Sequence, residues 1–141
     1  MILIRIWPHR RNPHGTEETK ILFYNSIPQI FENLLQGNSE NVICTDSNVA
    51  KIPAVKDFLD KAKLQNAQVV IINAGEENKT LDSVLSIIKS ALDKSFSRGC
   101  RFIAIGGGVI SDMTAFASSL YKRGAKLEIV PTTLLSMADA C

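Results

Sequence analysis

The residues best suited to chemistry form a glycine-rich turn that follows an apolar run. Residues 102–105 are apolar, Gly106, Gly107 and Gly108 follow them directly, and Asp112 comes shortly afterwards. The backbone amides of such a turn can approach a pyrophosphate without interference from a Cβ, and the start of the next helix adds a partial positive charge. The pattern predicts a nucleotide-binding turn. The alternative is a tight strand-to-helix connection that binds no ligand.

Polar side chains also follow two earlier apolar runs. Asp46 and Asn48 come after residues 41–45, and Glu76 and Lys79 come after residues 68–73. Asp46 could accept hydrogen bonds from a ribose diol, with Asn48 beside it, or it could cap the next helix. Glu76 and Lys79 could bind a nucleotide or form a solvated pair on the surface.

Four further residues near the end of the chain have side chains that could bind a ligand. Thr132 and Thr133 follow a proline, and their hydroxyls could donate to a phosphate or a carboxamide, or could satisfy a turn. Arg123, in the last turn of a predicted helix, could simply offset the helix dipole. Asp139 lies in an otherwise apolar stretch, where a carboxylate needs a partner.

Strands and helices alternate along the part of the chain that carries these residues. The strands are expected at residues 2–7, 20–24, 41–45, 68–73, 101–106 and 127–130, with helices at residues 26–37, 53–62, 80–99 and 109–123. This order is typical of an α/β protein with a Rossmann-like parallel sheet and helices on both faces. Ligands of such sheets bind beyond the carboxyl ends of the strands, where the polar loops described above lie.

Apolar spacing predicts which residues the elements bury. The 69–72 run reads as a strand that is buried on both faces. Helical periodicity predicts inward-facing side chains in the last two helices: Leu81, Val84, Leu85, Ile88, Ala91, Leu92 and Phe96 in one, and Met113, Phe116, Ala117 and Leu120 in the other.

Composition describes one soluble globular domain. The chain has 141 residues, 45% of them hydrophobic, and a formal net charge of +2, which predicts neither a nucleic-acid partner nor a membrane partner. Its three cysteines are widely spaced and form no CxxC pair, so neither a disulfide framework nor a cysteine zinc site is indicated. A cytoplasmic location is expected.

The glycine turn departs from the usual dinucleotide fingerprint. A GxGxxG pattern that starts at Gly106 includes Gly108, but its third position is Ser111. No acidic residue ends the next strand, where a ribose hydroxyl would be recognised. A standard Rossmann dinucleotide unit is therefore disfavoured.

The ordered motifs closely resemble those of the 3-dehydroquinate synthase family and its sugar-phosphate cyclase relatives. The matching segments are residues 105–112 (IGGGVISD), 121–124 (YKRG) and 131–140 (PTTLLSMADA). Residues 45–49 (TDSNV) and 75–79 (GEENK) resemble the family's earlier motifs, in the same order. The resemblance covers about residues 42–141, and residues 1–40 match only loosely.

The resemblance implies an enzyme that acts on a small sugar phosphate. NAD would transiently oxidise a substrate hydroxyl, phosphate would be eliminated, and a carbocycle would close, as in the shikimate pathway to aromatic amino acids. The family forms homodimers and holds a divalent metal, zinc or cobalt, in a helical C-terminal domain. Carried over by motif, the NAD contacts are Asp46, Asn48, Glu76, Lys79, Gly107, Gly108, Val109, Asp112, Thr132 and Thr133.

The resemblance also implies catalytic and substrate-binding roles. Asp112 and Asp139 would be catalytic, Asp139 would also contact substrate, and Arg123 would reach the substrate phosphate across a dimer interface. The family's metal ligands, one Glu and two His, fall beyond Cys141. We therefore expect residues 1–141 to be an NAD-binding α/β domain that is inactive alone, with residues 1–19 only loosely assigned to a strand and a loop.

Three departures from the family pattern and several alternative functions remain. Ser111 replaces a usual glycine, Ala74 a usual aspartate and Cys141 a common serine. The loss at Ala74 could weaken binding of the adenosine ribose. The alternatives are another sugar-phosphate cyclase, an iron- or zinc-dependent alcohol or glycerol dehydrogenase, and a non-catalytic nucleotide-binding module.

Overall fold

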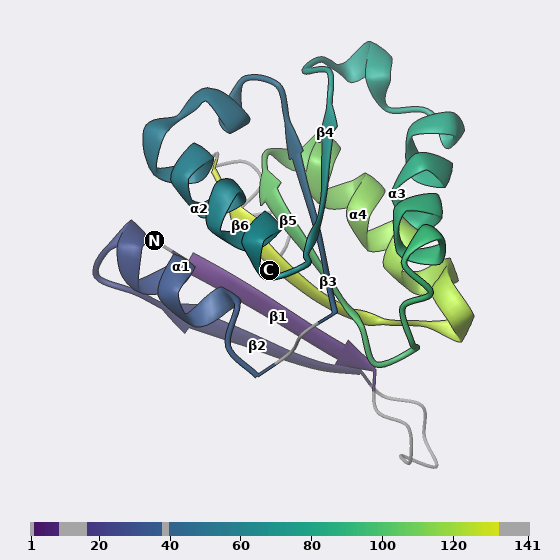
Figure 1. The fold of residues 1–141 in the computed structure, drawn as a ribbon, viewed down its shortest axis with the longest axis horizontal. Coiled ribbons are helices and arrows are strands. Elements are labelled where there is room, and N and C mark those ends of the chain that lie inside the picture. Colours follow the sequence, from purple (N-terminus) through teal and green to yellow (C-terminus); the bar gives the residue numbers. More distant parts are fainter. Residues whose placement is uncertain (1, 9–16, 38–39, 133–141) are drawn as a thin grey trace.

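The computed structural model of the chain describes residues 2–8, 17–37 and 40–132, with side chains described from Lys20 onward. The described residues form one sheet in the order β2-β1-β6-β5-β3-β4 (Figure 1). The strands are β1 (Ile2–Pro8), β2 (Glu17–Phe23), β3 (Asn41–Asp46), β4 (Gln68–Ile72), β5 (Arg101–Gly106) and β6 (Lys126–Pro131).

Four of the strands form the parallel sheet that the sequence predicts. β6, β5, β3 and β4 are parallel neighbours, whereas β1 pairs antiparallel with both β2 and β6. The alternation of strands and helices did not predict this antiparallel extension. The short connection from β1 to β2 accounts for their antiparallel pairing, because a parallel crossover needs a dozen or more residues.

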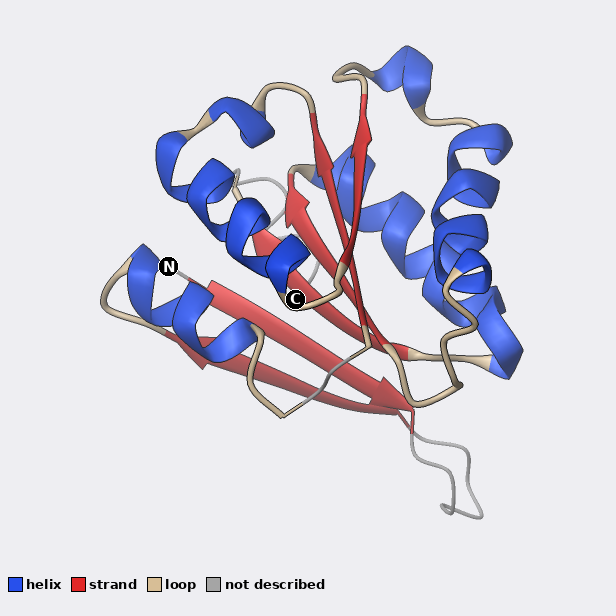
Figure 2. Ribbon diagram, in the orientation of Figure 1, coloured by secondary structure: helices blue, strands red, loops and turns tan. Residues whose placement is uncertain are grey.

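Helices cover both faces of the sheet, as predicted (Figure 2). On one face, α1 (Ile27–Leu34) and α2 (Pro53–Leu64) pack over residues such as Ile43 and Ile103. On the other face, α3 (Leu81–Asp93) and α4 (Gly108–Leu120) pack over residues such as Phe102 and Ile129. The sheet therefore separates two apolar cores, and the loops lie at the ends of its strands.

The beginnings of the helices follow from local sequence. Pro53 begins α2, where its missing N–H costs nothing. Thr80 caps α3, because its Oγ1 accepts a hydrogen bond from Ser83 N at 3.1 Å. No side chain caps the start of α4, which begins within the glycine run.

Some of the apolar residues predicted to face inward are exposed instead. On α3, Val84 is buried but Leu81 is 63% exposed, and Leu85 and Leu92 are also exposed. On α4, Phe116 is 48% exposed, and Leu120 is exposed as well. The apolar stripe of each helix is wider than the face that the sheet can cover.

The prediction that residues 69–72 form a strand buried on both faces is also wrong. β4 lies at the edge of the sheet and pairs only with β3 among the described residues, and Ile71 is exposed. An edge strand has a neighbour on one side only, so a continuous apolar run does not guarantee a central position.

A buried ion pair connects α1 to the centre of the sheet. Arg101 is 3% exposed and Glu128 is 0% exposed, and Arg101 Nη1 lies 3.1 Å from Glu128 Oε1. The Arg101 Nε also donates to Asn41 Oδ1 at 2.9 Å, and its Nη2 donates to the carbonyl of Leu34. One guanidinium therefore links β3, β5, β6 and the end of α1.

Candidate functional site

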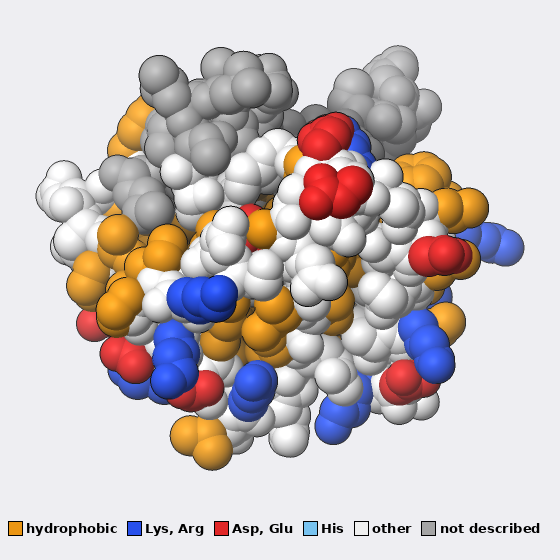
Figure 3. Space-filling view, turned by 90° about the horizontal axis from the view of Figure 1, so that it is seen from above, with side chains coloured by type: hydrophobic (Ala, Val, Ile, Leu, Met, Phe, Trp, Pro, Cys, Tyr) orange, Lys and Arg blue, Asp and Glu red, His pale blue; other side chains and the backbone are white. Residues whose placement is uncertain are grey.

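The four parallel strands end at one edge of the sheet, which Figure 3 views from above. Apolar side chains surface in the middle of this face, with charged side chains around them. β3 is hydrogen-bonded to β5, and the chain leads from β3 outward to β4 and from β5 outward to β6. Ligands of α/β sheets bind where the strand order reverses in this way. Asp46 and Gly106 end the two strands at this point.

The glycine turn begins α4 at the same point. Gly107 is the N-cap of α4 without a side-chain hydrogen bond, so among the described residues no side chain caps the amides of the first helical turn. A Cβ on Gly106 would meet Ile110 Cβ at 3.1 Å, whereas a Cβ on Gly108 would meet nothing within 4 Å. A side chain at Gly106 would therefore press on Ile110, whereas the position of a Cβ at Gly108 is open space.

Thr132 lies directly beside this turn. Its N–H donates to the Gly106 carbonyl at 2.9 Å, one residue after β6 ends. The predicted neighbours Thr133 and Asp139 lie outside the described residues.

The loop after β3 is fixed by its own carboxylate. Asp46 Oδ1 accepts hydrogen bonds from the N–H groups of Asn48 and Val49, both at 2.8 Å. This geometry is an Asx turn that leads into the 3-10 helix η1 (Val49–Lys51), and Asp46 does not cap α2, whose N-cap is Ile52 without a side-chain hydrogen bond. The contact of Asp46 with a ribose stays a prediction. Ser47 Oγ accepts from Ala74 N at 3.0 Å, so the loops after β3 and β4 are joined.

An ion pair links the loop after β4 to the first turns of α4. Lys79 Nζ lies 2.7 Å from Asp112 Oδ2 and 4.0 Å from Glu76 Oε1, so Asp112 is the closer partner. The Lys79 side chain is 39% exposed and that of Asp112 is 62% exposed. The hydrogen bond and charge of Asp112, with a smaller contribution from Glu76, raise the pKa of Lys79.

A cavity of ≈ 350 Å³ lies beside this ion pair. Its other lining residues are apolar, apart from Thr80, and come from α3 and α4: Leu81, Val84, Met113 and Phe116. An apolar surface with two charged groups at its margin could accept a flat ring that carries polar substituents. The exposed apolar side chains of Leu81 and Phe116 therefore line a cavity of the candidate site.

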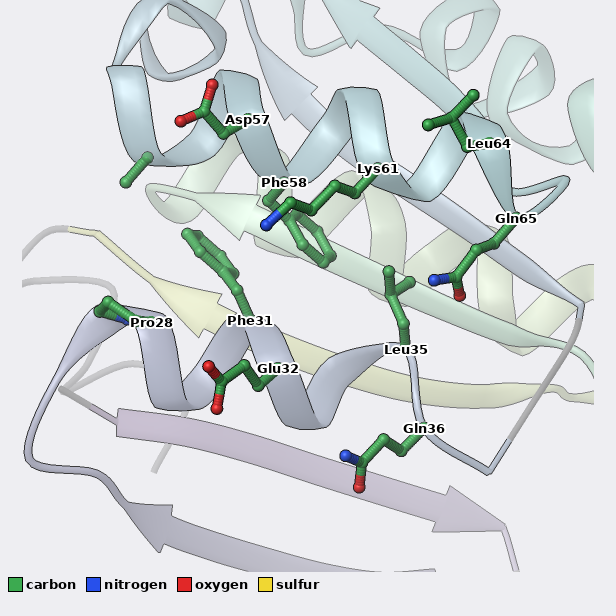
Figure 4. A pocket seen from close by; sticks show the side chains of 11 residues that line it. Pro28, Phe31, Glu32, Leu35, Gln36, Asp57, Phe58, Lys61, Leu64 and Gln65 are labelled. Carbon is green, nitrogen blue, oxygen red and sulfur yellow. The ribbon is translucent and has the colours of Figure 1, made fainter.

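Another cavity, of ≈ 510 Å³, lies between α1 and α2 and contains none of the predicted site residues (Figure 4). The rings of Phe31 and Phe58 stack there with centroids 4.5 Å apart, and Glu32 from α1 and Lys61 from α2 also line the cavity. The cavity is formed by the packing of two helices rather than by strand-end loops. We therefore place the candidate site at the strand ends.

The structure separates Arg123 from the other predicted residues. α4 ends at Leu120, not at Arg123 as the sequence suggested, and Arg123 ends the 3-10 turn η3 (Tyr121–Arg123). η3 precedes β6, so Arg123 lies at the edge where β6 begins, and the glycine turn lies at the edge where β6 ends. Arg123 is exposed.

Two absences concern the described residues alone. Among the side chains that the structure describes, in residues 20–37 and 40–132, no three of His, Cys, Asp or Glu gather closely enough to hold a metal ion. Within the same ranges, no helix combines the length and apolar character that crossing a bilayer requires.

Two features of the site carried no sequence signal. The Ser47–Ala74 hydrogen bond joins residues 27 positions apart, and the Lys79–Asp112 pair joins residues 33 positions apart. Only the strand order brings these positions together. A correct prediction of the order β5-β3-β4 would have indicated that the loops are neighbours.

Comparisons with known proteins agree with the motifs. Residues 69–141 match the family model described as 3-dehydroquinate synthase N-terminal. The 3-dehydroquinate synthase of Pelagibacter ubique (strain HTCC1062) is 36% identical over 130 residues, which cover 89% of this chain and 35% of the relative. The chain thus spans about a third of the length of this relative.

Two solved structures share the fold at 25% sequence identity. One is the 2-epi-5-epi-valiolone synthase ValA of Streptomyces hygroscopicus subsp. jinggangensis 5008 with NAD+ and Zn2+ bound, with a TM-score of 0.62 over 79% of this chain and 32% of that one. The other is a 2-deoxy-scyllo-inosose synthase in complex with carbaglucose-6-phosphate, NAD+ and Co2+, with a TM-score of 0.58 over 72% of this chain and 28% of that one.

Proposed function

Because the chain belongs to the 3-dehydroquinate synthase family, we propose that it forms the NAD-binding part of a 3-dehydroquinate synthase. This enzyme converts 3-deoxy-D-arabino-heptulosonate 7-phosphate to 3-dehydroquinate and phosphate. The observation that carries the proposal is the uncapped glycine turn at the reversal of strand order, close to the Lys79–Asp112 ion pair. The family model covers all of these residues.

The residues at the strand ends fit a dinucleotide. The open space above Gly108 and the uncapped amides of the first turn of α4 suit a pyrophosphate. The cavity between α3 and α4 offers an apolar surface, and Thr132 adds a hydroxyl beside the turn. When bound, NAD supplies the reversible oxidation of a substrate hydroxyl, on which phosphate elimination and ring closure depend.

The ion pair has a defined task in this proposal. Lys79 holds the carboxylate of Asp112 away from the helix terminus, where it would repel a pyrophosphate. Asp112 in turn orients the ammonium of Lys79 toward the cavity margin that both residues share. In this proposal, Asp46, Asn48 and Glu76 supply further polar groups around the dinucleotide. Thr133 and Asp139, which follow Thr132 in the sequence, belong to the same site.

Arg123 has a separate role in this proposal. It binds the substrate phosphate of a second copy of the protein, because it lies at the opposite edge of the sheet from its own glycine turn. A guanidinium can contact a phosphate with two parallel hydrogen bonds. The active enzyme is then a cytoplasmic homodimer, and its divalent metal, zinc or cobalt, is bound by residues other than those described here.

A second candidate is a different sugar-phosphate cyclase. The solved structures of a 2-deoxy-scyllo-inosose synthase and a 2-epi-5-epi-valiolone synthase favour it, because both share the fold of this chain. The strand-end loops are the same in either case. The two candidates therefore differ in substrate, not in the use of this site.

The test is an assay of phosphate release by the full-length polypeptide that carries this sequence. The enzyme is supplied with NAD+ and Zn2+ or Co2+, and with either the heptulosonate 7-phosphate or glucose 6-phosphate, of which carbaglucose-6-phosphate is the carbocyclic analogue. Omission of NAD+ after removal of bound nucleotide is the control. Product identity is established by NMR.

Three outcomes separate the candidates. NAD-dependent phosphate release from the heptulosonate, with 3-dehydroquinate as product, supports the proposed function. Release from glucose 6-phosphate alone supports the second candidate. Release from neither substrate, by a protein that is folded and loaded with NAD+ and metal, contradicts the first proposal.

A further inference from the structure

The turn that carries Arg123 has an unusual backbone. Lys122 has φ 43° and ψ 43°, Arg123 has φ 69°, and Gly124 has φ 107°. Glycine adopts this left-handed region at little cost, but residues with a Cβ do so only when their surroundings hold them there. Two consecutive side-chain-bearing residues in this region therefore require a specific restraint.

The loop between α3 and β5 supplies that restraint. Arg98 donates from Nε to the Gly124 carbonyl and from Nη2 to the Arg123 carbonyl, both at 3.3 Å. The Phe96 carbonyl accepts from Tyr121 Oη at 2.5 Å and from Lys122 Nζ at 2.6 Å. Four hydrogen bonds thus fix both ends of the turn to one loop.

The two halves of this restraint differ in character. Tyr121 is buried, and its ring packs edge to face on Phe102 with centroids 5.5 Å apart, so its contact belongs to the core. Arg98 is only half-buried and contacts the backbone of Arg123 itself. Its two hydrogen bonds hold the carbonyl groups of Arg123 and Gly124, both of which have positive φ, and they leave the Arg123 side chain exposed.

We propose that Arg98 is a positioning residue that fixes the backbone of Arg123 so that its guanidinium meets a phosphate at a set place. This inference rests on the proposed function of Arg123. The positive charges of Lys122 and Arg98 at the same turn add to the attraction for an anion. Without Arg98, the turn relaxes toward the negative φ angles that residues with a Cβ prefer. The backbone of Arg123 is then no longer held in one position, and neither is its guanidinium.

A double-mutant cycle in the full-length enzyme tests this role. The variants are Arg98→Ala, Arg123→Ala and the combination, with Lys63→Ala on α2 as a control that also removes an exposed positive charge. For each variant, the KM for the sugar phosphate, the KM for NAD+, kcat and the melting temperature are measured. Arg98→Gln, which keeps an N–H donor, is the second variant if Arg98→Ala does not fold.

The expected result is a KM for the sugar phosphate raised about tenfold by Arg98→Ala, because the loss of a fixed Arg123 backbone should cost about as much as one hydrogen bond to the phosphate. The KM for NAD+ stays unchanged, and Arg98→Gln has a smaller effect. In the Arg123→Ala background, Arg98→Ala changes the substrate KM no further, because the group on which it acts is gone.

Two results overturn the inference. One is an unchanged substrate KM in Arg98→Ala, or in Arg98→Gln if only that variant folds, although Arg123→Ala raises it. The other is an effect of Arg98→Ala that is undiminished in the Arg123→Ala background. An unchanged substrate KM in Arg123→Ala is a separate result, which contradicts the proposed role of Arg123 and with it the role of Arg98.

Discussion

Lys79 Nζ and Asp112 Oδ2 lie 2.7 Å apart, although the residues are 33 positions apart in the sequence. The lysine comes from the loop after β4 and the carboxylate from the beginning of α4, so the pair spans the gap between two strand-end loops. Both side chains border the cavity between α3 and α4. This contact therefore joins the loop after β4 to the helix α4, which the glycine turn begins.

Replacing Asp112 should separate function from stability. In Asp112→Ala, turnover should fall about 100-fold or more, because a misplaced site group costs that much. The stability should change little, because solvent screens an exposed ion pair and its net contribution is small. Turnover and urea denaturation check this, with Asp82→Ala, another exposed carboxylate early in a helix, as the control. Wild-type turnover in Asp112→Ala would remove Asp112 from the site.

The ion pair should be visible in the titration of Lys79. Because Asp112 raises the pKa of Lys79, the stabilisation from the pair is fully present below the ordinary lysine range. It is lost as the pH rises through the raised value. An NMR titration of the Lys79 side chain should show this elevation, and Asp112→Asn should remove it. An identical titration of Lys79 in wild type and Asp112→Asn would show that the pair does not form in solution.

The buried ion pair of Arg101 with Glu128 should dominate stability at the centre of the sheet. Arg101→Met should lower the free energy of unfolding by about 3 kcal/mol, because it leaves a buried carboxylate without its closest cation. Adding Glu128→Leu should recover most of that loss. Urea denaturation measures both. A loss below about 1 kcal/mol in Arg101→Met would show that the pair is not important for stability.

Much of the site could be predicted because it depends on local rules. The glycine run, the polar residues at the strand ends and the Thr80 cap all follow from short-range patterns. The structure places Asp46 at the end of β3, and Lys79, Gly107 and Thr132 in the segments that follow β4, β5 and β6. The parallel direction of the last four strands followed from the helices that connect them, whereas their order in the sheet was not predicted.

What could not be predicted depends on distant parts of the chain. The Lys79–Asp112 pair and the Arg101–Glu128 pair join residues that only the strand order brings together. The apolar spacing of α3 and α4 does not distinguish side chains that pack in the core from those, such as Leu81 and Phe116, that line a cavity. The left-handed backbone of Lys122 and Arg123 depends on hydrogen bonds from a separate loop.

The central claim is that the glycine turn binds the pyrophosphate of NAD, and Gly108 offers a direct test. A Cβ at Gly108 meets no neighbouring atom within 4 Å, so a small side chain has room in the fold, and in this account it would occupy the space assigned to the ligand. Gly108→Val should therefore keep the melting temperature of the wild type. Isothermal titration of the full-length polypeptide with NAD+ measures the affinity, with Lys63→Ala as the control.

We expect Gly108→Val to bind NAD+ at least about tenfold more weakly than the wild type, because the ligand loses close approach to the amides of α4. Lys63→Ala should bind NAD+ as the wild type does. Equal NAD+ affinity in Gly108→Val and the wild type, with both proteins folded, would contradict the placement of the dinucleotide at this turn.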